Sequence, residues 1–251
     1  MTTILSDGVC LVPDWPAPSG VRSLSTTRRG GISLGKYSSL NLGDHVGDDP
    51  QAVLANRRWL ADRVSGEPCW LNQVHGTTVV DAAAVAAGEQ RPDADAAFAY
   101  QAGVICTVMT ADCLPVLLCD DRGRVVAAAH AGWRGLLDGV LEATVAAMAI
   151  PGEHLLAWLG PAIGPMAFEV GDEVRLAFVE RDAGATAAFV PAPGDKWLAD
   201  IFMLASQRLA ACGVERVFGG NHCTVNDPER FFSYRRDGQT GRMATMVWLE
   251  R

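Results

Sequence analysis

Two side chains that can bind a metal ion or act in catalysis lie in the segment TADCLPVLLCDDRGRVVAAAHAGWRG, residues 110–135. Cys113 precedes one strand-like apolar run, His130 closes a second, and the sequence DDRG between the runs is typical of a tight turn. A loop that places residue 120 opposite 123, or 119 opposite 124, also places Cys113 opposite His130. Directly opposed residues share one face of a hairpin, with Cβ atoms about 4.5–5.5 Å apart. We therefore expect this thiol and this imidazole to share a metal ion or a proton.

Two details leave the register of the hairpin open. A three-residue loop with a bulge at Gly123 would shift the pairing, and a slip of one residue reverses every side chain. Pro115 lies inside the first run, which predicts an edge strand or a bulge there. Each residue also has an ordinary alternative, since Cys113 would serve as a small core residue and His130 as a hydrogen-bonded structural histidine.

His75 is a third candidate ligand, at the end of the segment LNQVHG. Like His130, it closes a strand-like run and precedes a small residue. Two imidazoles and one thiolate leave one tetrahedral position of zinc vacant, which is the pattern of catalytic rather than structural zinc sites. Water in the vacant position would be activated towards hydroxide near neutral pH. The other histidines are weaker candidates, because His45 and His222 lie in polar loops and His154 precedes a strand.

Arginine side chains form a second group of interest. On a helical wheel for residues 50–64, Arg57 falls in the same stripe as the apolar residues Val53 and Leu60. An unpaired buried charge is very costly. Arg57 is therefore expected to pair either with an internal carboxylate or with an anionic group of a substrate.

The segment ERFFSYRRDGQTGR, residues 229–242, carries several arginines beside glycines and aromatic residues in a chain whose net charge is −8. Arg134 follows His130 by four positions and so starts near the candidate metal site. A guanidinium offers the planar fork that binds phosphate or carboxylate bidentately. The ordinary alternative is a solvated basic hairpin. The arginines of the segment are Arg230, Arg235, Arg236 and Arg242.

The elements that must position these residues are strands and helices in mixed order. Strands pair with one another as often as they alternate with helices, which favours an α+β fold with mixed sheets over a regular βαβ array. No internal repeat or linker divides the chain, so we expect one domain spanning residues 1–251. The expected strands are 21–27, 69–75, 77–80, 103–110, 114–120, 124–130 and 243–249, and the expected helices are 50–64, 135–149 and 197–212.

Composition limits the function classes. Apolar residues make up 49% and charged residues 20% of the chain, which is typical of globular proteins. The net charge of −8 argues against nucleic acid and anionic membranes as partners, since both require a basic face. We expect no transmembrane helix and no secretory signal. Seven cysteines without a framework spacing predict reduced thiols and a cytoplasmic location.

Six segments together resemble the YfiH-like family, also called the laccase-domain or multicopper polyphenol oxidase family. They are LNLGDHVGDD, NQVHG, TADCLPVLL, HAGWRGL, GPAIGP with FEVG, and FFSYRRDGQTGRMATMVWL, and the resemblance runs from about residue 20 to 250. It implies an α+β fold of packed mixed sheets with outer helices, and zinc held by His75, Cys113 and His130. It also implies phosphorolysis of adenosine, inosine, guanosine and methylthioadenosine, with some adenosine deamination.

For this reaction the chain offers several substrate-binding candidates. Arg57 and Arg236 would anchor inorganic phosphate, and Asn41 and Gln73, which lie in family motifs, would hydrogen-bond the base or the ribose. Asp112 would position a ligand or act as a general acid. The segment NHCTV departs from the commoner pattern of an acidic residue before Cys-Thr, which leaves the roles of His222 and Cys223 open. Substrate-binding candidates are thus Asn41, Arg57, Gln73, Asp112, Arg134 and Arg236.

Other functions remain open at this stage. A single copper ion is conceivable with two histidines and a cysteine, but multicopper chemistry needs several histidine-rich sites and the chain has five histidines. Cys113 as nucleophile and His130 as base would make a thiol hydrolase, for example of a cell-wall amide. A non-catalytic metal-binding module is the third class. The expected partners are purine nucleosides and inorganic phosphate, and the expected state is a monomer or weak homo-oligomer.

Overall fold

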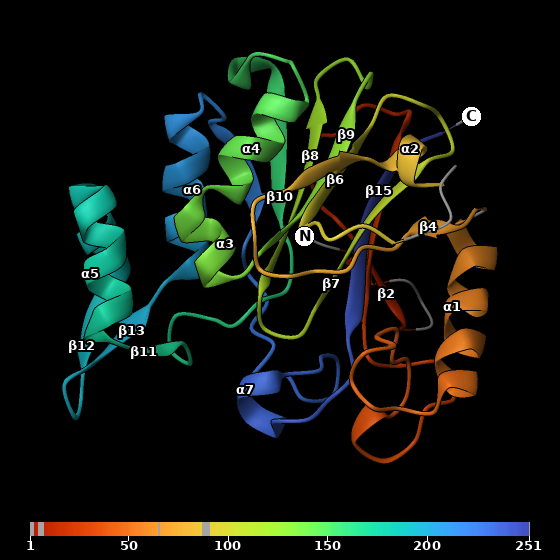
Figure 1. Cartoon of the computed structure of the whole chain (residues 1–251), viewed down its shortest axis with the longest axis horizontal. Coiled ribbons are helices and arrows are strands. Elements are labelled where there is room, and N and C mark those ends of the chain that lie inside the picture. Colours follow the sequence, from red (N-terminus) through yellow and green to blue (C-terminus); the bar gives the residue numbers. More distant parts are fainter. Residues whose placement is uncertain (1–2, 5–7, 65, 87–90, 251) are drawn as a thin grey trace.

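Two six-stranded sheets form the centre of the molecule (Figure 1). The computed structural model describes residues 3–4, 8–64, 66–86 and 91–250. In spatial order the first sheet contains β1 (Thr3–Ile4), β2 (Cys10–Val12), β3 (Val21–Thr26), β15 (Met243–Leu249), β7 (Ile105–Thr110) and β4 (Pro68–Cys69). The second contains β14 (Arg216–Gly219), β10 (Leu155–Leu159), β8 (Leu114–Asp120), β9 (Val126–Ala131), β6 (Ala96–Ala99) and β5 (Val79–Asp81).

Both sheets are mixed. The pairs β4–β7, β5–β6 and β10–β14 are parallel, whereas β8 pairs antiparallel with both of its neighbours. A third, three-stranded sheet at one end of the molecule has the order β11 (Glu169–Gly171), β13 (Lys196–Ala199) and β12 (Phe189–Ala192).

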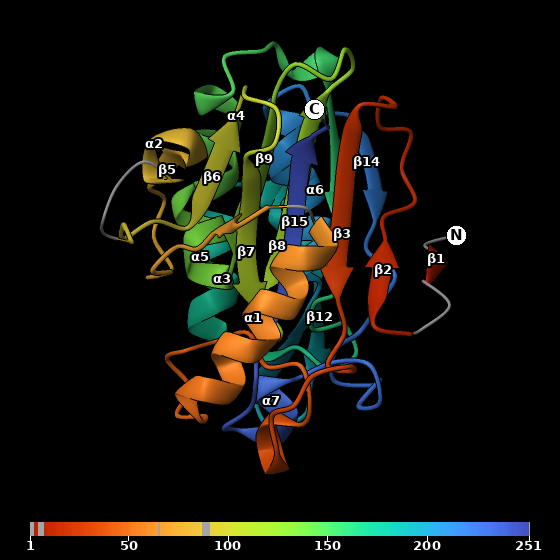
Figure 2. The same ribbon diagram turned by 90° about the vertical axis from the view of Figure 1, so that its right-hand side faces the viewer.

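The two large sheets pack face to face (Figure 2). Their shared core includes Val108 and Val247 of the first sheet and Leu117, Val126 and Trp158 of the second. Every residue of β8 and of β9 is buried, because helices cover the other face of the second sheet. This double burial explains why both strands appear in the sequence as continuous apolar runs without polar alternation.

Helices form the outer layers. α1 (Pro50–Val64) packs on the first sheet through Leu60 and Val64. α3 (Trp133–Asp138), α4 (Val140–Ala147) and α6 (Ile201–Ala211) cover the second sheet, and α5 (Asp172–Arg181) lies beyond them beside the small sheet. The expected α+β fold of mixed sheets with outer helices is confirmed. The short elements are α2 (Ala82–Ala86), α7 (Tyr234–Asp237), η1 (Gly35–Tyr37), η2 (Gly152–His154) and η3 (Ala183–Ala188).

Two predicted helices differ from the structure. The helix expected over 135–149 is broken at Gly139, whose φ of 109° and ψ of 33° end α3 and begin α4. The helix expected over 197–212 begins as the strand β13. Asp200 then caps α6, because its carboxylate accepts hydrogen bonds from the backbone amides of Phe202 and Met203.

The strands expected over 69–75 and 77–80 overlap real strands, but their predicted extents were wrong. Only Pro68–Cys69 and Val79–Asp81 are strands there, and most of the intervening chain is irregular. His75 lies in this irregular segment with a φ of 61°. Its backbone therefore turns sharply, where the prediction had placed the end of an extended strand.

The register of the β8–β9 hairpin corrects the predicted pairing. Pro115 lies opposite His130, so Cys113, which precedes β8, is not directly opposed to that histidine. Asp120 sets this register, because its buried carboxylate accepts hydrogen bonds from the amides of Arg124 and Val125 and closes a longer turn. The shift is two residues, and an even shift keeps the same face of the strand.

The expected edge strand or bulge at Pro115 is wrong as well. β8 is a central strand, between β10 and β9. Pro115 is tolerated because the pairing with β10 ends at Val116, so the proline lies at the end of the ladder. In the part of the chain that the structure describes, no helix is long and apolar enough to cross a membrane.

Candidate metal centre and its pocket

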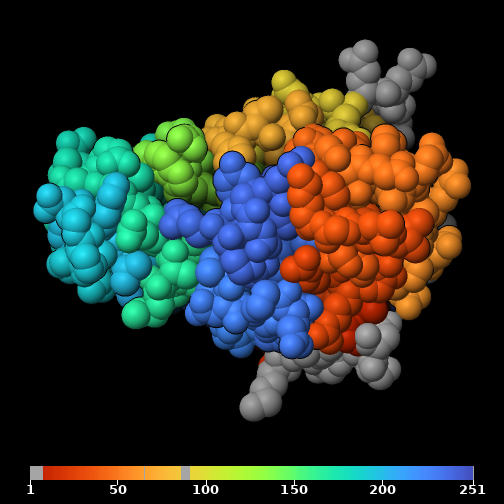
Figure 3. Space-filling view, turned by 90° about the horizontal axis from the view of Figure 1, so that it is seen from below, coloured from red at the N-terminus to blue at the C-terminus, as the bar shows by residue number. Residues whose placement is uncertain are grey.

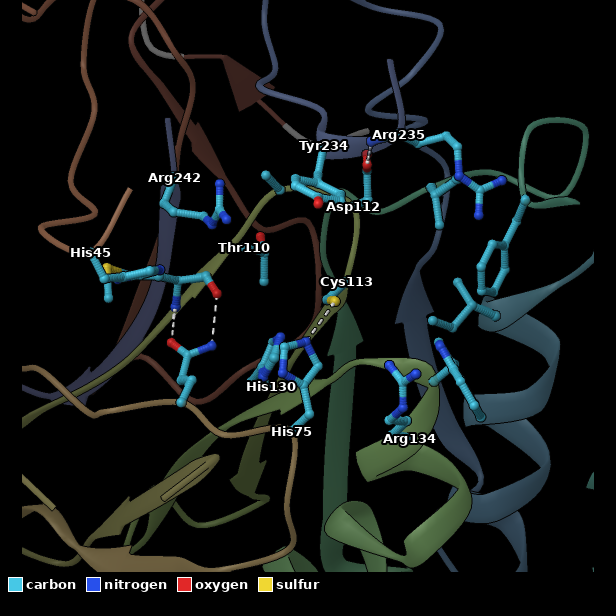
Figure 4. A pocket seen from close by; sticks show the side chains of 17 residues that line it. His45, His75, Thr110, Asp112, Cys113, His130, Arg134, Tyr234, Arg235 and Arg242 are labelled. Carbon is cyan, nitrogen blue, oxygen red and sulfur yellow. Dashed lines mark hydrogen bonds between the residues drawn. The ribbon is translucent and has the colours of Figure 1, made fainter. Parts of the chain in front are cut away.

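Three segments that are distant in the sequence bring His75, Cys113 and His130 together (Figure 4). His75 comes from the irregular segment before β5, Cys113 from the connection between β7 and β8, and His130 from β9. Their ligand atoms all lie within 4.8 Å of one another, and Cys113 Sγ is 3.8 Å from His75 Nε2. The structure therefore places two imidazoles and one thiol where a single metal ion could bind all three.

Asp95, the residue before β6, orients both His75 and His130. The side chain is fully buried. Its carboxylate lies 2.8 Å from His130 Nδ1 and accepts hydrogen bonds from the backbone amides of Val74, His75 and Gly76. Burial raises the pKa of Asp95, but the hydrogen bonds from His130 and from the backbone outweigh burial and lower it. The carboxylate thus fixes the tautomer of one histidine and the backbone turn of the other.

Close packing around the thiol requires a glycine. A Cβ atom on Gly132 would lie 2.8 Å from His75 Cδ2 and 3.0 Å from Cys113 Sγ. Asp112 has a φ of 92°, and its buried carboxylate accepts hydrogen bonds from Thr224 Oγ1 at 2.5 Å and Ser233 Oγ at 3.1 Å. These bonds hold the strained connection that presents Cys113.

The electrostatics of the pair formed by Cys113 and His130 favour charge separation. Burial raises the pKa of the Cys113 thiol, but His130 and His75 outweigh burial and lower it to about 6. Burial lowers the pKa of His130, but the Cys113 thiolate and Asp95 outweigh burial and raise it to about 9. Both shifts favour a thiolate beside an imidazolium over the neutral pair.

The donor set fits a single zinc or copper ion. Imidazole nitrogen and thiolate sulfur are ligands for both metals, and three protein donors leave one position open. The Asp95 bond to Nδ1 of His130 leaves the other ring nitrogen available as a ligand. Within the described residues this is the one group of histidine, cysteine and carboxylate side chains with such spacing.

The three donors open into a pocket of about 530 Å³. This volume lies within the range of pockets for small ligands. Ile163, Phe168 and Ile201 belong to one hydrophobic cluster, and together with Trp133, which packs against it, they supply the apolar, aromatic wall of the pocket. The remaining lining residues are His45, Gln73, His75, Met109, Thr110, Ala111, Asp112, Cys113, His130, Arg134, Tyr234, Arg235 and Arg242.

Three of the predicted substrate-binding residues line this pocket. Arg134 is exposed and stacks on Trp133, with 4.4 Å from its guanidinium carbon to the ring centroid. The side-chain amide of Gln73 donates a hydrogen bond to the carbonyl of Met109 at 2.8 Å and accepts one from the backbone amide of Met109 at 2.7 Å. The carboxylate of Asp112 is occupied by its own hydrogen bonds. Gln73 and Asp112 therefore shape the pocket wall, whereas Arg134 keeps its guanidinium at the surface.

The other three predicted residues are not among those that line the pocket. Arg57 lies 3.3 Å from a carboxylate oxygen of Asp44 and donates to the carbonyl of Leu42, which is the internal pairing considered from the sequence. Arg236 pairs with Asp237 and donates to backbone carbonyls. For both arginines, phosphate binding stays a prediction.

Asn41 is the third residue outside the pocket. Its side chain is fully buried, and its amide is hydrogen-bonded to the backbone of Gly43 and of Arg242 and to Asp48. Contact of Asn41 with base or ribose also stays a prediction.

Sequence reasoning missed several site residues. Asp95 gave a weak signal, a carboxylate at the start of the small apolar run AAFA. Arg235 and Arg242 belong to the arginine cluster of residues 229–242 but are not among the predicted substrate-binding residues, and neither is Tyr234. His45 was set aside as a loop residue, yet it lines the pocket.

His222 and Cys223 lie outside the pocket. His222 is half-buried, packs near Phe231 with ring centroids 5.9 Å apart, and has no hydrogen-bond partner for Nε2 in the described part of the chain. Cys223 Sγ accepts a hydrogen bond from the amide of Gly164 at 3.3 Å. Cys223 therefore supports the neighbouring loop.

Comparisons with known proteins identify the family of the chain. A family model described as multi-copper polyphenol oxidoreductase laccase matches residues 22–250. The chain is 57% identical over 242 residues to purine nucleoside phosphorylase PA4543 of Pseudomonas aeruginosa, covering 96% of this chain and 98% of the relative. It is 56% identical over 241 residues to purine nucleoside phosphorylase YfiH of Escherichia coli, covering 95% and 98%.

Solved structures show the same fold. The crystal structure of protein NMB0706 of Neisseria meningitidis superposes with a TM-score of 0.94 at 53% identity, covering 96% of this chain and 99% of that one. The crystal structure of YlmD from Geobacillus stearothermophilus superposes with a TM-score of 0.88 at 28% identity, covering 100% and 99%. The chain therefore belongs to the YfiH-like family, the family described as multi-copper polyphenol oxidoreductase laccase.

Proposed function

We propose that the chain is a purine nucleoside phosphorylase that holds one zinc ion with His75, Cys113 and His130, and that it deaminates adenosine as a side activity. The observation that carries the proposal is the convergence of these three donors in a pocket with an apolar aromatic wall and arginines. The relatives named purine nucleoside phosphorylase support the reaction class. The proposed substrates are adenosine, inosine, guanosine and methylthioadenosine, each with inorganic phosphate.

In phosphorolysis, an oxygen of phosphate forms a bond to ribose C1′ while the bond from C1′ to the purine nitrogen breaks. The apolar wall, which includes Trp133 and Phe168, suits the flat purine, and the pocket arginines suit the phosphate charge. A bound zinc ion would supply Lewis-acid chemistry at the three donors. In the side reaction, water adds at purine C6 and ammonia leaves, without consumption of phosphate.

Product analysis tests the proposal directly. Zinc-loaded protein is incubated with adenosine or inosine, with and without inorganic phosphate, and the metal content is measured in the same sample. We expect ribose-1-phosphate and free base only with phosphate, and some inosine from adenosine with or without it. The Cys113→Ala variant should lose both activities, because one ligand is missing. If folded wild type forms neither product, the nucleoside proposal is wrong.

A thiol hydrolase is the second candidate, and the electrostatics of the site favour it. The low pKa of Cys113, about 6, and the raised pKa of His130, about 9, describe an activated nucleophile beside an acid. Such an enzyme would act on an amide without metal and would be inactivated by alkylation of Cys113. The thiol hydrolase is excluded if the zinc-loaded protein is fully active on nucleosides and loses this activity when the metal is removed.

A reducing, cytoplasmic location is part of the same proposal. All seven cysteines are free, and Cys113 must stay reduced to bind a metal ion.

A further inference from the structure

Arg242 is a cation in the pocket wall without a carboxylate partner among the described residues. It is half-buried and lines the pocket, and its Nη1 donates to the backbone carbonyls of Thr240 at 3.0 Å and Gly241 at 3.1 Å. Burial lowers the pKa of Arg242, as expected for a guanidinium withdrawn from water. Arg57 and Arg236, in contrast, already have carboxylate partners.

Residues 41–43, which are far away in the sequence, hold the backbone of Arg242 in place. Asn41 Oδ1 accepts a hydrogen bond from the amide of Arg242 at 2.8 Å, and the amide of Leu42 donates to the carbonyl of Arg242 at 3.1 Å. A Cβ atom on Gly43 would lie 2.8 Å from Arg242 Cγ, so this position needs a glycine. These contacts fix the backbone and the first part of the side chain, which is the preorganisation expected of a ligand-binding arginine.

Arg242 also occupies a distinct part of the pocket. In Figure 4, Arg242 and His45 lie on one side of Cys113, and Arg134 lies on the other. Arg134 is exposed and stacked on Trp133. The Nη1 atom of Arg235 is committed to the backbone carbonyls of Ala167 and Glu169. Arg242 is thus the pocket arginine that combines burial, a fixed backbone and no carboxylate partner within the described chain.

We propose that Arg242, seated by Asn41 and Gly43, binds the inorganic phosphate that attacks the nucleoside. The proposal rests on the proposed phosphorylase function. A phosphate dianion would form an ion pair with Arg242, and the guanidinium fork matches two of its oxygens. The apolar wall formed by Trp133 and Phe168 is then left for the purine.

Direct binding of inorganic phosphate tests this assignment without any turnover. Zinc-loaded wild type, Arg242→Gln and Arg242→Lys are titrated with phosphate by calorimetry, alone and with free adenine present. Arg230→Gln is the matched control, because Arg230 lies in the same segment, is partly buried and pairs with Asp227 outside the pocket. Zinc content and thermal unfolding show that each variant is folded. AMP is titrated in parallel.

We expect wild type to bind phosphate and Arg242→Gln to bind it at least ~10-fold more weakly, a loss of about 1.4 kcal/mol. Arg242→Lys should show an intermediate loss, since it keeps the charge without the fork, and Arg230→Gln should match wild type. Equal phosphate affinity in wild type and folded Arg242 variants would overturn the assignment, as would no binding by wild type in either condition. AMP that binds more tightly than phosphate, with the same dependence on Arg242, would transfer the subsite to a substrate-borne phosphate.

The two proposals fail separately. Phosphate binding that depends on Arg242, with no ribose-1-phosphate formed from any nucleoside, keeps the anion subsite and rejects the phosphorylase. If Arg242→Gln forms ribose-1-phosphate with an unchanged KM for phosphate, the phosphorylase proposal is kept and the phosphate subsite at Arg242 is rejected.

Discussion

At the scale of single residues, the candidate centre depends on one carboxylate as much as on its three donors. Asp95 holds the ring of His130 and the backbone of His75 at the same time. Metal-binding histidines commonly donate their second ring nitrogen to such a carboxylate, which fixes the tautomer and raises the basicity of the ligand. Because Asp95 is fully buried and its four contacts come from two segments, its main effect is to place both imidazoles before any metal arrives.

Asp95→Asn tests this role. The amide has one acceptor oxygen where the carboxylate has two, so it cannot satisfy every donor. We expect zinc affinity to fall ~10- to 100-fold, measured by competition with a chromophoric chelator. Asp93→Asn, two residues away and exposed, is the control and should bind zinc like wild type. Unchanged affinity in folded Asp95→Asn would reduce Asp95 to a structural residue.

Asp44 gives a prediction for acid stability. Burial raises the pKa of Asp44, but Arg91 and Arg57 outweigh burial and lower it to about 2, below the unfolded value of about 3.9. The depressed pKa means that the carboxylate stabilises the fold fully above about pH 5 and loses this effect as the pH falls through 4 towards 2. The side chain is 36% exposed, so solvent screening limits the gain to about 1 kcal/mol.

Urea unfolding of wild type and Asp44→Asn at several pH values measures this effect. The difference in unfolding free energy should be largest near pH 6 and should shrink steadily below pH 4. A difference that grows on acidification would contradict the assignment. Asp121→Asn is the matched comparison for Asp44→Asn. Asp121 also pairs with basic side chains, His154 and Arg216, and it does not line the pocket.

At the scale of elements, the strongest sequence patterns gave the most accurate bounds. The helix 50–64 and the strands 114–120 and 243–249 match α1, β8 and β15. The errors fall where one local pattern covers two elements, as in 135–149. The apolar repeat there continues through the break, and only the left-handed conformation of Gly139 separates α3 from α4.

Gly139→Ala tests the importance of that break. At a φ of 109° a Cβ atom costs about 1–2 kcal/mol of backbone strain. The nearest atoms to such a Cβ lie at 3.5 Å, so little steric clash is added. We expect the melting temperature to fall by roughly 2–8 °C. Gly20→Ala, with open space around the added Cβ, should have little effect.

At the scale of the whole molecule, the two packed sheets turn distant segments into one site. The candidate ligands lie on three segments, and the pocket is also lined by Ile201 of α6, Tyr234 of α7 and Arg242, the residue before β15. A metal ion bound by the folded state and not by the unfolded chain stabilises the fold in proportion to its affinity. Metal binding should therefore be visible as global stability.

Metal removal checks this coupling. Chelator-treated protein should melt several degrees below zinc-loaded protein, since a ligand at 100 times its Kd adds about 2.7 kcal/mol. Readdition of zinc should restore the melting temperature. Cys113→Ala should show no zinc-dependent shift, because a donor is missing. An identical melting temperature with and without zinc in wild type would show that the donors do not bind it in the folded state.

The sequence by itself indicated the strongest helices and strands, the α+β class and the three candidate metal donors. The helices and strands follow from residue type and from spacing between neighbours along the chain. The candidate donors follow from their residue types at the ends of apolar runs. Only the tertiary structure decided the register of β8 and β9, the contacts of Asp95 with both histidines and which arginines line the pocket. Asp120 closes a longer turn than the pattern DDRG predicts, and Asn41 reaches Arg242 across the fold. Such contacts form when sheets pack, so local sequence does not encode them.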